Sequence, residues 1–506
     1  MMNLAGALEI QARRRPDHPA VIAGTQTVTH AAFAERVRRI ASHVAALGTA
    51  PGDIVGVGLD DSAEHLAVLY ALARSGRTIL PLDCRWTAAE TRRVAEHFGA
   101  RLAILPAAGS GSAAGSGSVA GSGSVAGSDL GAVPVAPVDA AWNAAVERAS
   151  DDSVAAADGE TDLLVSLSSG TTGRPKGPMI THRHFFRRFM THWIDLGLNA
   201  QDRFVCATPL YFGGGRTFAM SVLFSGGTVV LFPPPHDPAA LVAEIDRTDA
   251  TSVFLVPAQL RRLLELPADA VAPLRRLRLM LSSGAPLTSA ERGRIRDRLC
   301  ANFCEYYAST EGGGVSLLRP EQYARHGETV GRPVFGVEVE IVDEAGQPLP
   351  AGQTGRLRYR GPGVATGYYR DPEASREAFE DGWFYPGDLA SCDPHGYITL
   401  RGRSKDLIIR GGVNIHPAEV EATLADHPQV AEAAVVGWPS PALGEEVAAF
   451  VRTRGPVHPD LLVEWCRERL APYKKPRQVF VVDEFPRNSA GKVVKTALAA
   501  TLPPLS

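Results

Sequence analysis

Short apolar runs alternate with amphipathic stretches along the first hundred residues of the chain. A helical spacing of apolar side chains connects Phe33, Val37, Ile40, Val44 and Leu47. Around and after it come apolar runs and one further amphipathic stretch, in the order 54–59 (apolar), 78–82 (apolar), 87–98 (amphipathic) and 102–105 (apolar). This alternation of helix and strand signals predicts an α/β fold built on a sheet.

The alternation stops at Ala108. From there the unit AGSGS plus Ala or Val is repeated to Val125, and a partial copy ends at Ser128. A segment without large apolar side chains cannot offset the entropy of ordering, so we expect a flexible surface insertion at about residues 107–133. Deletion of residues 108–128 should leave activity nearly intact.

The apolar run Leu163–Leu167 leads into LSSGTTGRPKG, which ends at Gly177. Glycines in such a turn allow backbone N–H groups to approach an anion, and hydroxyls add further donors. The residues concerned are Ser168, Ser169, Gly170, Thr171, Thr172, Gly173 and the charged Lys176. The order differs from a Walker loop, because no hydroxyl follows the lysine. The motif predicts a phosphate-binding loop at a sheet edge; the alternative, a surface linker, fits the preceding strand poorly.

Motifs further along the chain add an aromatic side chain, two carboxylates and further turns. Ser282–Pro286 follows a second apolar run, and Glu305–Glu311 combines aromatic, hydroxyl and carboxylate groups ahead of three glycines. A carboxylate near phosphate-binding hydroxyls suits Mg²⁺, and the turn around Asp388 supplies an acid that can accept hydrogen bonds from a ribose. Each of these motifs alone is also compatible with an ordinary turn, so the prediction rests on their joint order along the chain.

Length and charge narrow the class of protein. The chain has 506 residues, with 52 basic and 55 acidic side chains and a formal charge of −3. We expect two or three domains, small-molecule partners and no nucleic acid. The six cysteines are scattered, the first residues lack a signal-peptide core, and no apolar run is long enough for a transmembrane helix, so we expect a cytoplasmic protein.

These motifs resemble the acyl-adenylate-forming (AMP-binding) superfamily, and most closely its acyl-CoA and aryl-CoA synthetases. The resemblance covers nearly the whole chain and rests on LSSGTTGRPKG, SSGAP, YASTEG, GRP, YPGDL, GRSKDLIIRGGVNIHPAEVE and PRNSAGK in family order. It implies an α/β protein with a large N-terminal domain of several subdomains and mixed sheets (residues 1–402). It also implies a small mobile α+β C-terminal domain (residues 403–506).

The resemblance also implies roles for individual residues. Ser168 to Lys176 would bind the β- and γ-phosphates of ATP, Thr310 the α-phosphate, and Glu311 the Mg²⁺ ion. The adenine would lie between Tyr307 and the turn Gly284, Ala285, Pro286, while Asp388 and Arg403 would hold the ribose. Lys492 would be catalytic, since its ammonium can offset charge between the substrate carboxylate and the α-phosphate.

A second half-reaction requires a thiol to replace Lys492 at the acyl-adenylate. In the family the C-terminal domain rotates about a hinge, which corresponds here to Lys405. Gly411 and Gly412 would then line the tunnel for the pantetheine arm of CoA.

The sequence defines the substrate carboxylic acid less well. The region Thr208–Arg216 lacks the Asp by which amino-acid-activating relatives hold an α-amino group, so an amino acid is not expected. Phe212, Gly213, Gly214 and Arg216 are candidate pocket residues. Gly213 and Gly214 could make room for an aryl, alicyclic or branched acid, or only loosen a helix start. Arg216 could pair with a second substrate carboxylate, but its position favours a solvated helix face.

We therefore expect an AMP-forming carboxylic acid–CoA ligase that uses ATP, Mg²⁺ and CoA. The alternatives are a stand-alone adenylating enzyme that loads an acyl carrier protein, a catalytically inactive nucleotide-binding scaffold, and luciferase-like oxidative chemistry. Whether the chain forms a homodimer is left open.

Overall fold

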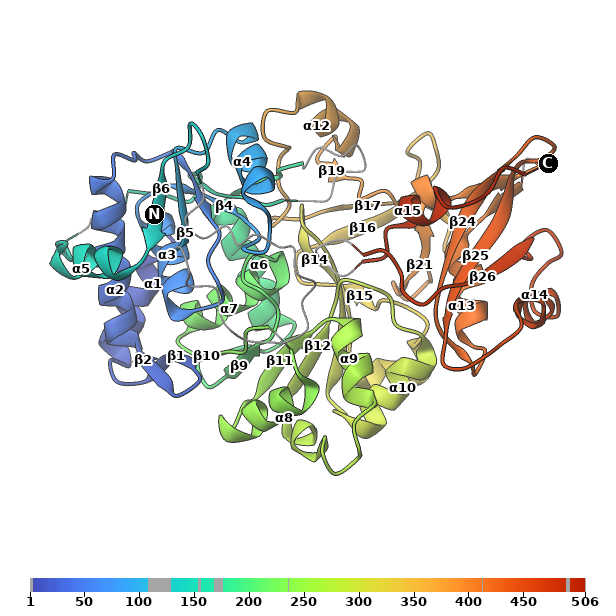
Figure 1. Cartoon of the computed structure of the whole chain (residues 1–506), viewed down its shortest axis with the longest axis horizontal. Coiled ribbons are helices and arrows are strands. Elements are labelled where there is room, and N and C mark those ends of the chain that lie inside the picture. Colours follow the sequence, from blue (N-terminus) through green and yellow to red (C-terminus); the bar gives the residue numbers. More distant parts are fainter. Residues whose placement is uncertain are drawn as a thin grey trace.

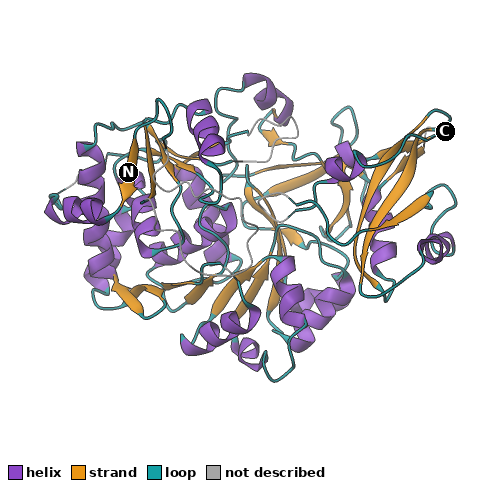
Figure 2. Ribbon diagram, viewed as in Figure 1, coloured by secondary structure: helices purple, strands orange, loops and turns teal. Residues whose placement is uncertain are grey.

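The computed structural model describes residues 3–107, 129–152, 156–167, 176–234, 236–411, 413–487 and 492–505, and every element below belongs to these residues. Two sheets with helices occupy the N-terminal part, a third sheet follows, and a fourth sheet with its own helices lies at the end of the molecule that holds the C-terminus (Figure 1). Figure 2 shows helices on both sides of the N-terminal sheets. This is the mixed α/β architecture expected from the sequence.

The largest sheet has nine strands in the order β15-β14-β13-β12-β11-β9-β10-β1-β2. Its centre, from β13 to β1, is parallel, and antiparallel pairs lie at both ends. Central strands of this kind are apolar on both faces because helices cover both. The strands are β1 (Pro19–Ala23), β2 (Gln26–Thr29), β9 (Arg203–Cys206), β10 (Thr228–Leu231), β11 (Ser252–Leu255), β12 (Leu279–Ser282), β13 (Phe303–Ser309), β14 (Gly313–Leu318) and β15 (Arg332–Pro333).

The second sheet has the order β6-β5-β3-β4-β7-β8 and is parallel except for the β7–β8 pair. Its strands are β3 (Ile54–Val57), β4 (Thr78–Pro81), β5 (Leu102–Pro106), β6 (Val135–Val138), β7 (Asp162–Val165) and β8 (Met179–Thr181). The predicted phosphate-binding residues 168–175 fall between β7 and β8 and lie outside the described residues, so their roles stay predictions.

Side-chain caps determine where most N-terminal helices begin. Thr29, Ser62, Thr87 and Thr181 each accept a hydrogen bond from a backbone N–H in the first turn of the helix that follows. The helices of this part are α1 (Gly6–Arg14), α2 (His30–Ala46), α3 (Ala63–Arg74), α4 (Ala88–His97), α5 (Ala140–Arg148), α6 (His182–Ile194), α7 (Gly213–Ser225), α8 (Pro238–Arg247), α9 (Pro257–Leu264), η1 (Ala272–Arg276), α10 (Ser289–Arg298), η2 (Pro320–Gln322) and α11 (Tyr323–His326).

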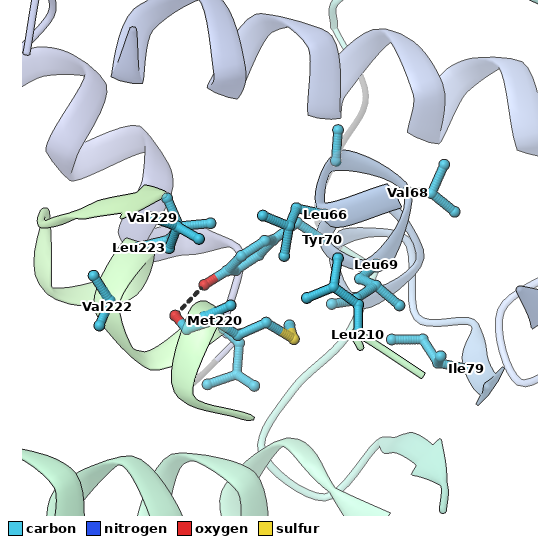
Figure 3. Packing of buried hydrophobic residues seen from close by; sticks show 14 of the residues in the cluster. Leu66, Val68, Leu69, Tyr70, Ile79, Leu210, Met220, Val222, Leu223 and Val229 are labelled. Carbon is cyan, nitrogen blue, oxygen red and sulfur yellow. Dashed lines mark hydrogen bonds between the residues drawn. The ribbon is translucent and has the colours of Figure 1, made fainter. Parts of the chain in front are cut away.

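Helix α3 joins the nine-stranded sheet to the second sheet. Its residues from Leu66 to Ala73 are all buried, as expected for a helix that is apolar on every side. It contacts β3 and β4 of one sheet and β1 of the other. Figure 3 shows Leu66, Leu69 and Tyr70 of α3 packed with Met220 and Leu223 of α7, and the Tyr70 hydroxyl donates to the Met220 carbonyl over 2.6 Å.

The third and fourth sheets are mainly antiparallel. The third contains β16 (Glu338–Val342), β17 (Gly355–Arg360), β18 (Phe379–Glu380), β19 (Trp383–Phe384), β20 (Asp388–Cys392) and β21 (Ile398–Arg403), with α12 (Pro372–Ala378) beside β18. The fourth contains β22 (Ile408–Arg410), β23 (Val413–Ile415), β24 (Val430–Ser440), β25 (Gly444–Thr453) and β26 (Gln478–Val481), with α13 (Pro417–Ala425), α14 (Pro459–Arg467) and α15 (Lys495–Ala499). The short helix η3 (Ser404–Asp406) connects β21 to β22.

The sequence predictions of individual elements are confirmed at α2, β3, β4, α4, β5, β7 and β12. The extent of the predicted insertion, about residues 107–133, stays a prediction. Residues 108–128 are outside the described residues, but Leu130 and Val133 are buried in the core of the second sheet, at 0% and 5% exposure. Their large apolar side chains offset the ordering entropy that the Gly/Ser/Ala repeat cannot. No helix of the described ranges is long and apolar enough to cross a membrane.

Candidate active site

The central contact of the site joins Tyr307, Asp388 and Arg403, which come from two sheets. The Tyr307 hydroxyl donates to one oxygen of the Asp388 carboxylate, and the Arg403 Nε donates to the other over 2.9 Å. Asp388 and Arg403 face each other across the β20–β21 pair, and Tyr307 lies on β13. Burial, with the adjacent carboxylate, raises the pKa of Tyr307 well above its usual value, so the hydroxyl keeps its proton and remains a donor.

Glu311 lies on the turn between β13 and β14, where its carboxylate contacts Tyr368. Its Oε1 accepts a hydrogen bond from the Tyr368 hydroxyl over 3.1 Å, and the Lys176 ammonium lies 5.1 Å from the centre of the Tyr368 ring. The backbone N–H of Tyr369 donates to the Gly177 carbonyl over 2.7 Å. The segment around Tyr368 therefore ties Lys176 and Gly177 to the predicted metal ligand.

Arg188 on α6 holds the turn of Thr310 and Glu311 through hydrogen bonds to backbone carbonyls. Its guanidinium donates to the carbonyls of Thr310, Glu311 and Gly363 over 3.1, 2.6 and 2.9 Å. Burial lowers its pKa to about 10, so the side chain stays charged at neutral pH. Sequence reasoning missed both Arg188 and Tyr368; the available signal for Arg188 was a charged residue on the apolar side of an amphipathic helix.

Lys492 belongs to the last described segment but lies within electrostatic reach of this N-terminal site. The pKa of Lys492 is lowered, first by desolvation and then by the Arg403 cation, against the opposite influence of Asp388 and Glu311. Lys492 is an exposed residue, yet the protein around its ammonium is close enough to lower its pKa by desolvation. The fold thus brings together four residues that the sequence separates by up to 181 positions, from Glu311 to Lys492.

The remaining predicted contacts with ATP and CoA lie on exposed turns. Gly284 follows β12 with a φ of +102°, and residues 284–286 are exposed at the carboxyl end of that parallel strand, where ligands of α/β sheets usually bind. Gly411 has a φ of +57°, and its N–H donates to the Leu443 carbonyl. Gly412 lies outside the described residues.

Lys405 is an exposed residue of η3, between the last strand of the third sheet and the first strand of the fourth. Desolvation lowers its pKa despite the neighbouring Asp406. The position is compatible with a hinge, since a change of its backbone angles would move one sheet relative to the other.

The three glycines at the start of α7 have different surroundings. A Cβ at Gly213 would meet no atom within 4 Å, whereas one at Gly214 would lie 2.7 Å from the Phe254 ring and one at Gly215 would lie 2.2 Å from the Thr208 carbonyl. Only Gly213 faces open space. Phe212 precedes them as the N-cap residue of α7.

The solvated helix face favoured for Arg216 is wrong. Arg216 is 1% exposed, and its guanidinium donates to the carbonyls of Leu210 and Tyr211 over 3.1 and 3.0 Å. Two residues after Gly214, it is rotated about 200° around the helix and so lies on the face opposite Phe254. It turns back onto the preceding turn, which spacing along a helix could not reveal.

Comparison with known proteins accounts for this arrangement. Residues 8–369 match the family model described as AMP-binding enzyme, and residues 419–492 match the AMP-binding enzyme C-terminal domain. The chain therefore belongs to the AMP-binding enzyme family. The matches and the site together define its class, an AMP-forming acyl-CoA synthetase.

Relatives and solved structures align over almost the whole chain. A feruloyl-CoA synthase of Amycolatopsis sp is 33% identical over 96% of each chain, and a 2-succinylbenzoate–CoA ligase of Geobacillus kaustophilus is 32% identical over 99% of each. A fatty acid–[acyl-carrier-protein] ligase, ScoC of Streptomyces coeruleorubidus, is 30% identical over 98% of this chain and 96% of its own. ATP-bound MatB from Rhodopseudomonas palustris superposes with a TM-score of 0.89 at 28% identity over 99% of both chains.

Proposed function

We propose that this enzyme activates an aromatic carboxylic acid and transfers it to CoA. The carboxylate attacks the α-phosphorus of ATP, the bond to the β-phosphate breaks, and pyrophosphate leaves. The CoA thiol then loses its proton to solvent and attacks the acyl carbonyl, and AMP leaves with the electron pair of the acyl–phosphate bond. The convergence of Tyr307, Asp388, Arg403, Glu311 and Lys492 on one site is the observation that carries this proposal.

The roles follow from the charge and position of each group. Asp388, held by Tyr307 and Arg403, would accept hydrogen bonds from the ribose hydroxyls, and residues 284–286 would contact the adenine. Ser168 to Lys176 would hold the leaving phosphates, with Thr310 at the α-phosphate. The desolvated Lys492 ammonium would lie between the two reacting anions and offset their repulsion. The nucleophile is already a carboxylate, so no general base is required.

Glu311 would hold Mg²⁺, since a carboxylate oxygen beside bound phosphates is the donor that this ion prefers. The residues fit the ion because the Glu311 carboxylate is oriented by the neutral Tyr368 hydroxyl, while the Arg188 guanidinium donates to the Glu311 backbone carbonyl rather than to the carboxylate. When bound, the ion would neutralise charge on the phosphates.

An aromatic acid is favoured by the side chains around the predicted pocket of Phe212, Gly213 and Gly214. Phe254 packs on Gly214, and the Phe218 ring lies 5.2 Å from Phe254 and 6.1 Å from Tyr306. Flat rings gain from edge-to-face and offset contacts with such a wall. The two CoA ligase relatives described above also act, by their names, on aromatic acids.

The second half-reaction requires Lys492 to withdraw. We propose that rotation about Lys405 brings the turn of Gly411 and Gly412 to the site, where it would line the path of the pantetheine arm. An acyl carrier protein remains the alternative acceptor, since one relative is a ligase for such a carrier.

The test is pyrophosphate release by the purified protein with ATP, Mg²⁺ and a panel of aryl, alicyclic, dicarboxylic and aliphatic acids, with and without CoA. Acid-dependent release and an aryl-CoA product are expected. Release that stalls at the adenylate would favour the carrier-protein acceptor, and a preference for long aliphatic acids would refute the aromatic substrate. The absence of pyrophosphate release with every acid would favour the alternative of an inactive nucleotide-binding scaffold.

A further inference from the structure

Arg216 is an unusual residue for the interior of the N-terminal domain. It is buried to 1% exposure, and among the described residues its Nε has no hydrogen-bond partner and its guanidinium takes part in no ion pair. Burial, with the repulsion of Arg188, lowers the pKa of Arg216 to about 9. A buried cation without a paired anion costs free energy, and an apolar side chain of similar volume would avoid that cost.

The guanidinium acts on one short turn. Its two hydrogen bonds to the carbonyls of Leu210 and Tyr211 reach back over the residues that precede α7, and Nη2 lies 3.5 Å from Ser166 Oγ at the end of β7. The side chain thus ties the turn between β9 and α7 to the carboxyl end of a strand in the second sheet.

Asp61 holds the same turn from the opposite side. Its carboxylate accepts the backbone N–H of Leu210 over 2.8 Å. Both backbone polar groups of Leu210 are therefore engaged by ionisable side chains, Arg216 of the following helix α7 and Asp61 of the segment before α3, whose pKa burial raises to about 7. The apolar side chain of Leu210 lies in the core cluster with Leu69 and Met220 (Figure 3). The turn has little freedom left, and it ends at Phe212, whose N–H donates to the Pro209 carbonyl over 3.0 Å.

We propose that Arg216 and Asp61 are positioning residues that clamp the turn Pro209–Phe212 and so fix the Phe212 ring at the edge of the acid pocket. The clamp itself is a property of the fold; its effect on the acid rests on the proposed function. A more mobile Phe212 would weaken the fit of the acid, while the nucleotide contacts, which lie on other elements, would be retained.

The clamp is tested first without any substrate, by hydrogen–deuterium exchange of peptides covering residues 205–215. Loss of one of these buried hydrogen bonds should speed exchange of the Leu210 and Phe212 amides about tenfold in Arg216→Met and Asp61→Ala. Asp61→Asn keeps an acceptor oxygen and should exchange as the wild type does. Unchanged exchange in both Arg216→Met and Asp61→Ala would overturn the clamp.

A matched control is Arg77→Met. Arg77 is also buried, at 3% exposure, and donates to the Thr49 hydroxyl and the Ser75 carbonyl over 2.7 and 2.9 Å, away from this turn. It should leave exchange at residues 205–215 unchanged. If Arg216→Met does not fold, Arg216→Lys replaces it, since one ammonium cannot reproduce the fork geometry of the guanidinium.

Kinetics then test the effect on the acid, with the best acid of the panel as probe. Arg216→Met and Asp61→Ala should raise KM for the acid about tenfold and leave KM for ATP unchanged, whereas Arg77→Met and Asp61→Asn should change neither. If Arg216→Met and Arg77→Met have equal kinetics while only Arg216→Met exchanges faster, the clamp exists but does not affect acid binding. That result would overturn the proposed effect of the clamp on the acid. An inactive wild type would count against the proposed function, while the exchange result would still decide the clamp.

Discussion

The Tyr307 hydroxyl donates to the same Asp388 carboxylate that the Arg403 guanidinium holds from the other side. The aromatic predicted to cover the adenine thus also orients the acid predicted to bind the ribose. Replacing Tyr307 by Phe keeps the ring but releases one oxygen of Asp388. We expect KM for ATP to rise about tenfold, in line with the loss of a hydrogen bond to a charged group, and KM for the acid to stay constant. Steady-state pyrophosphate release with either substrate varied would measure this, and an altered acid KM alone would contradict it.

Replacing Lys492 by Ala removes the ammonium on which Asp388, Glu311 and Arg403 act electrostatically. Adenylate formation should slow at least about a hundredfold, as is typical when one stabilising group of a transition state is lost. ATP should still bind, because the ribose and adenine contacts remain. Quench-flow measurement of pyrophosphate, with ATP binding followed by calorimetry, separates the two. Wild-type rates of pyrophosphate release would refute the catalytic role.

Replacing Lys405 by Pro fixes one backbone angle of η3 between the two sheets. Adenylate formation should persist while thioester formation stops, since only the second half-reaction requires the rotation. Lys405→Ala, which leaves the backbone free, serves as the control and should retain both steps. Equal loss of both half-reactions in the Pro variant would argue against a hinge.

Substitution by Ala of each of the three glycines at the start of α7 should have graded effects on stability and on the preference among acids. Gly213→Ala fills open space and should change stability by less than about 1 kcal/mol while narrowing the pocket. Gly214→Ala must displace the Phe254 ring and should shift the preference among acids. Gly215→Ala meets the Thr208 backbone at 2.2 Å and should cost about 3 kcal/mol or prevent folding. Thermal unfolding of the three proteins, with the acid panel, tests the order.

Acid should destabilise the protein through buried neutral histidines. Burial lowers the pKa of His192 and His65 to about 3, from an ordinary value of 6.5. The unfolded chain therefore binds protons between pH 6.5 and 3 that the folded chain excludes, so stability falls as pH drops through this window. His192→Phe keeps the stacking on Phe218, 4.2 Å away, and should flatten the fall of Tm between pH 7 and 5. The exposed His395→Phe is the control; equal slopes for the two variants would contradict the argument.

Much of this site could be predicted because each group of residues belongs to a short local motif with the glycines, prolines and hydroxyls typical of a turn. The carboxylate, aromatic and lysine of Glu311, Tyr307 and Lys492 needed only their order along the chain. The contacts of the supporting residues could not be predicted, because Arg188 and Arg216 act on backbone carbonyls that local sequence spacing does not reveal; the apolar side of α6 indicated only that Arg188 is unusual. Arg216 in particular has the sequence context of a surface position, and only the fold shows that it turns inward.

The central claim is that one site forms an acyl-adenylate and then a thioester. The most direct measurement is a single-turnover experiment with excess enzyme, ATP, Mg²⁺ and an aromatic acid, followed by mass spectrometry before and after CoA is added. We predict an acyl-adenylate that accumulates without CoA and converts to acyl-CoA and AMP on its addition. An adenylate that CoA leaves unchanged, or the absence of any adenylate with every acid, would contradict the account.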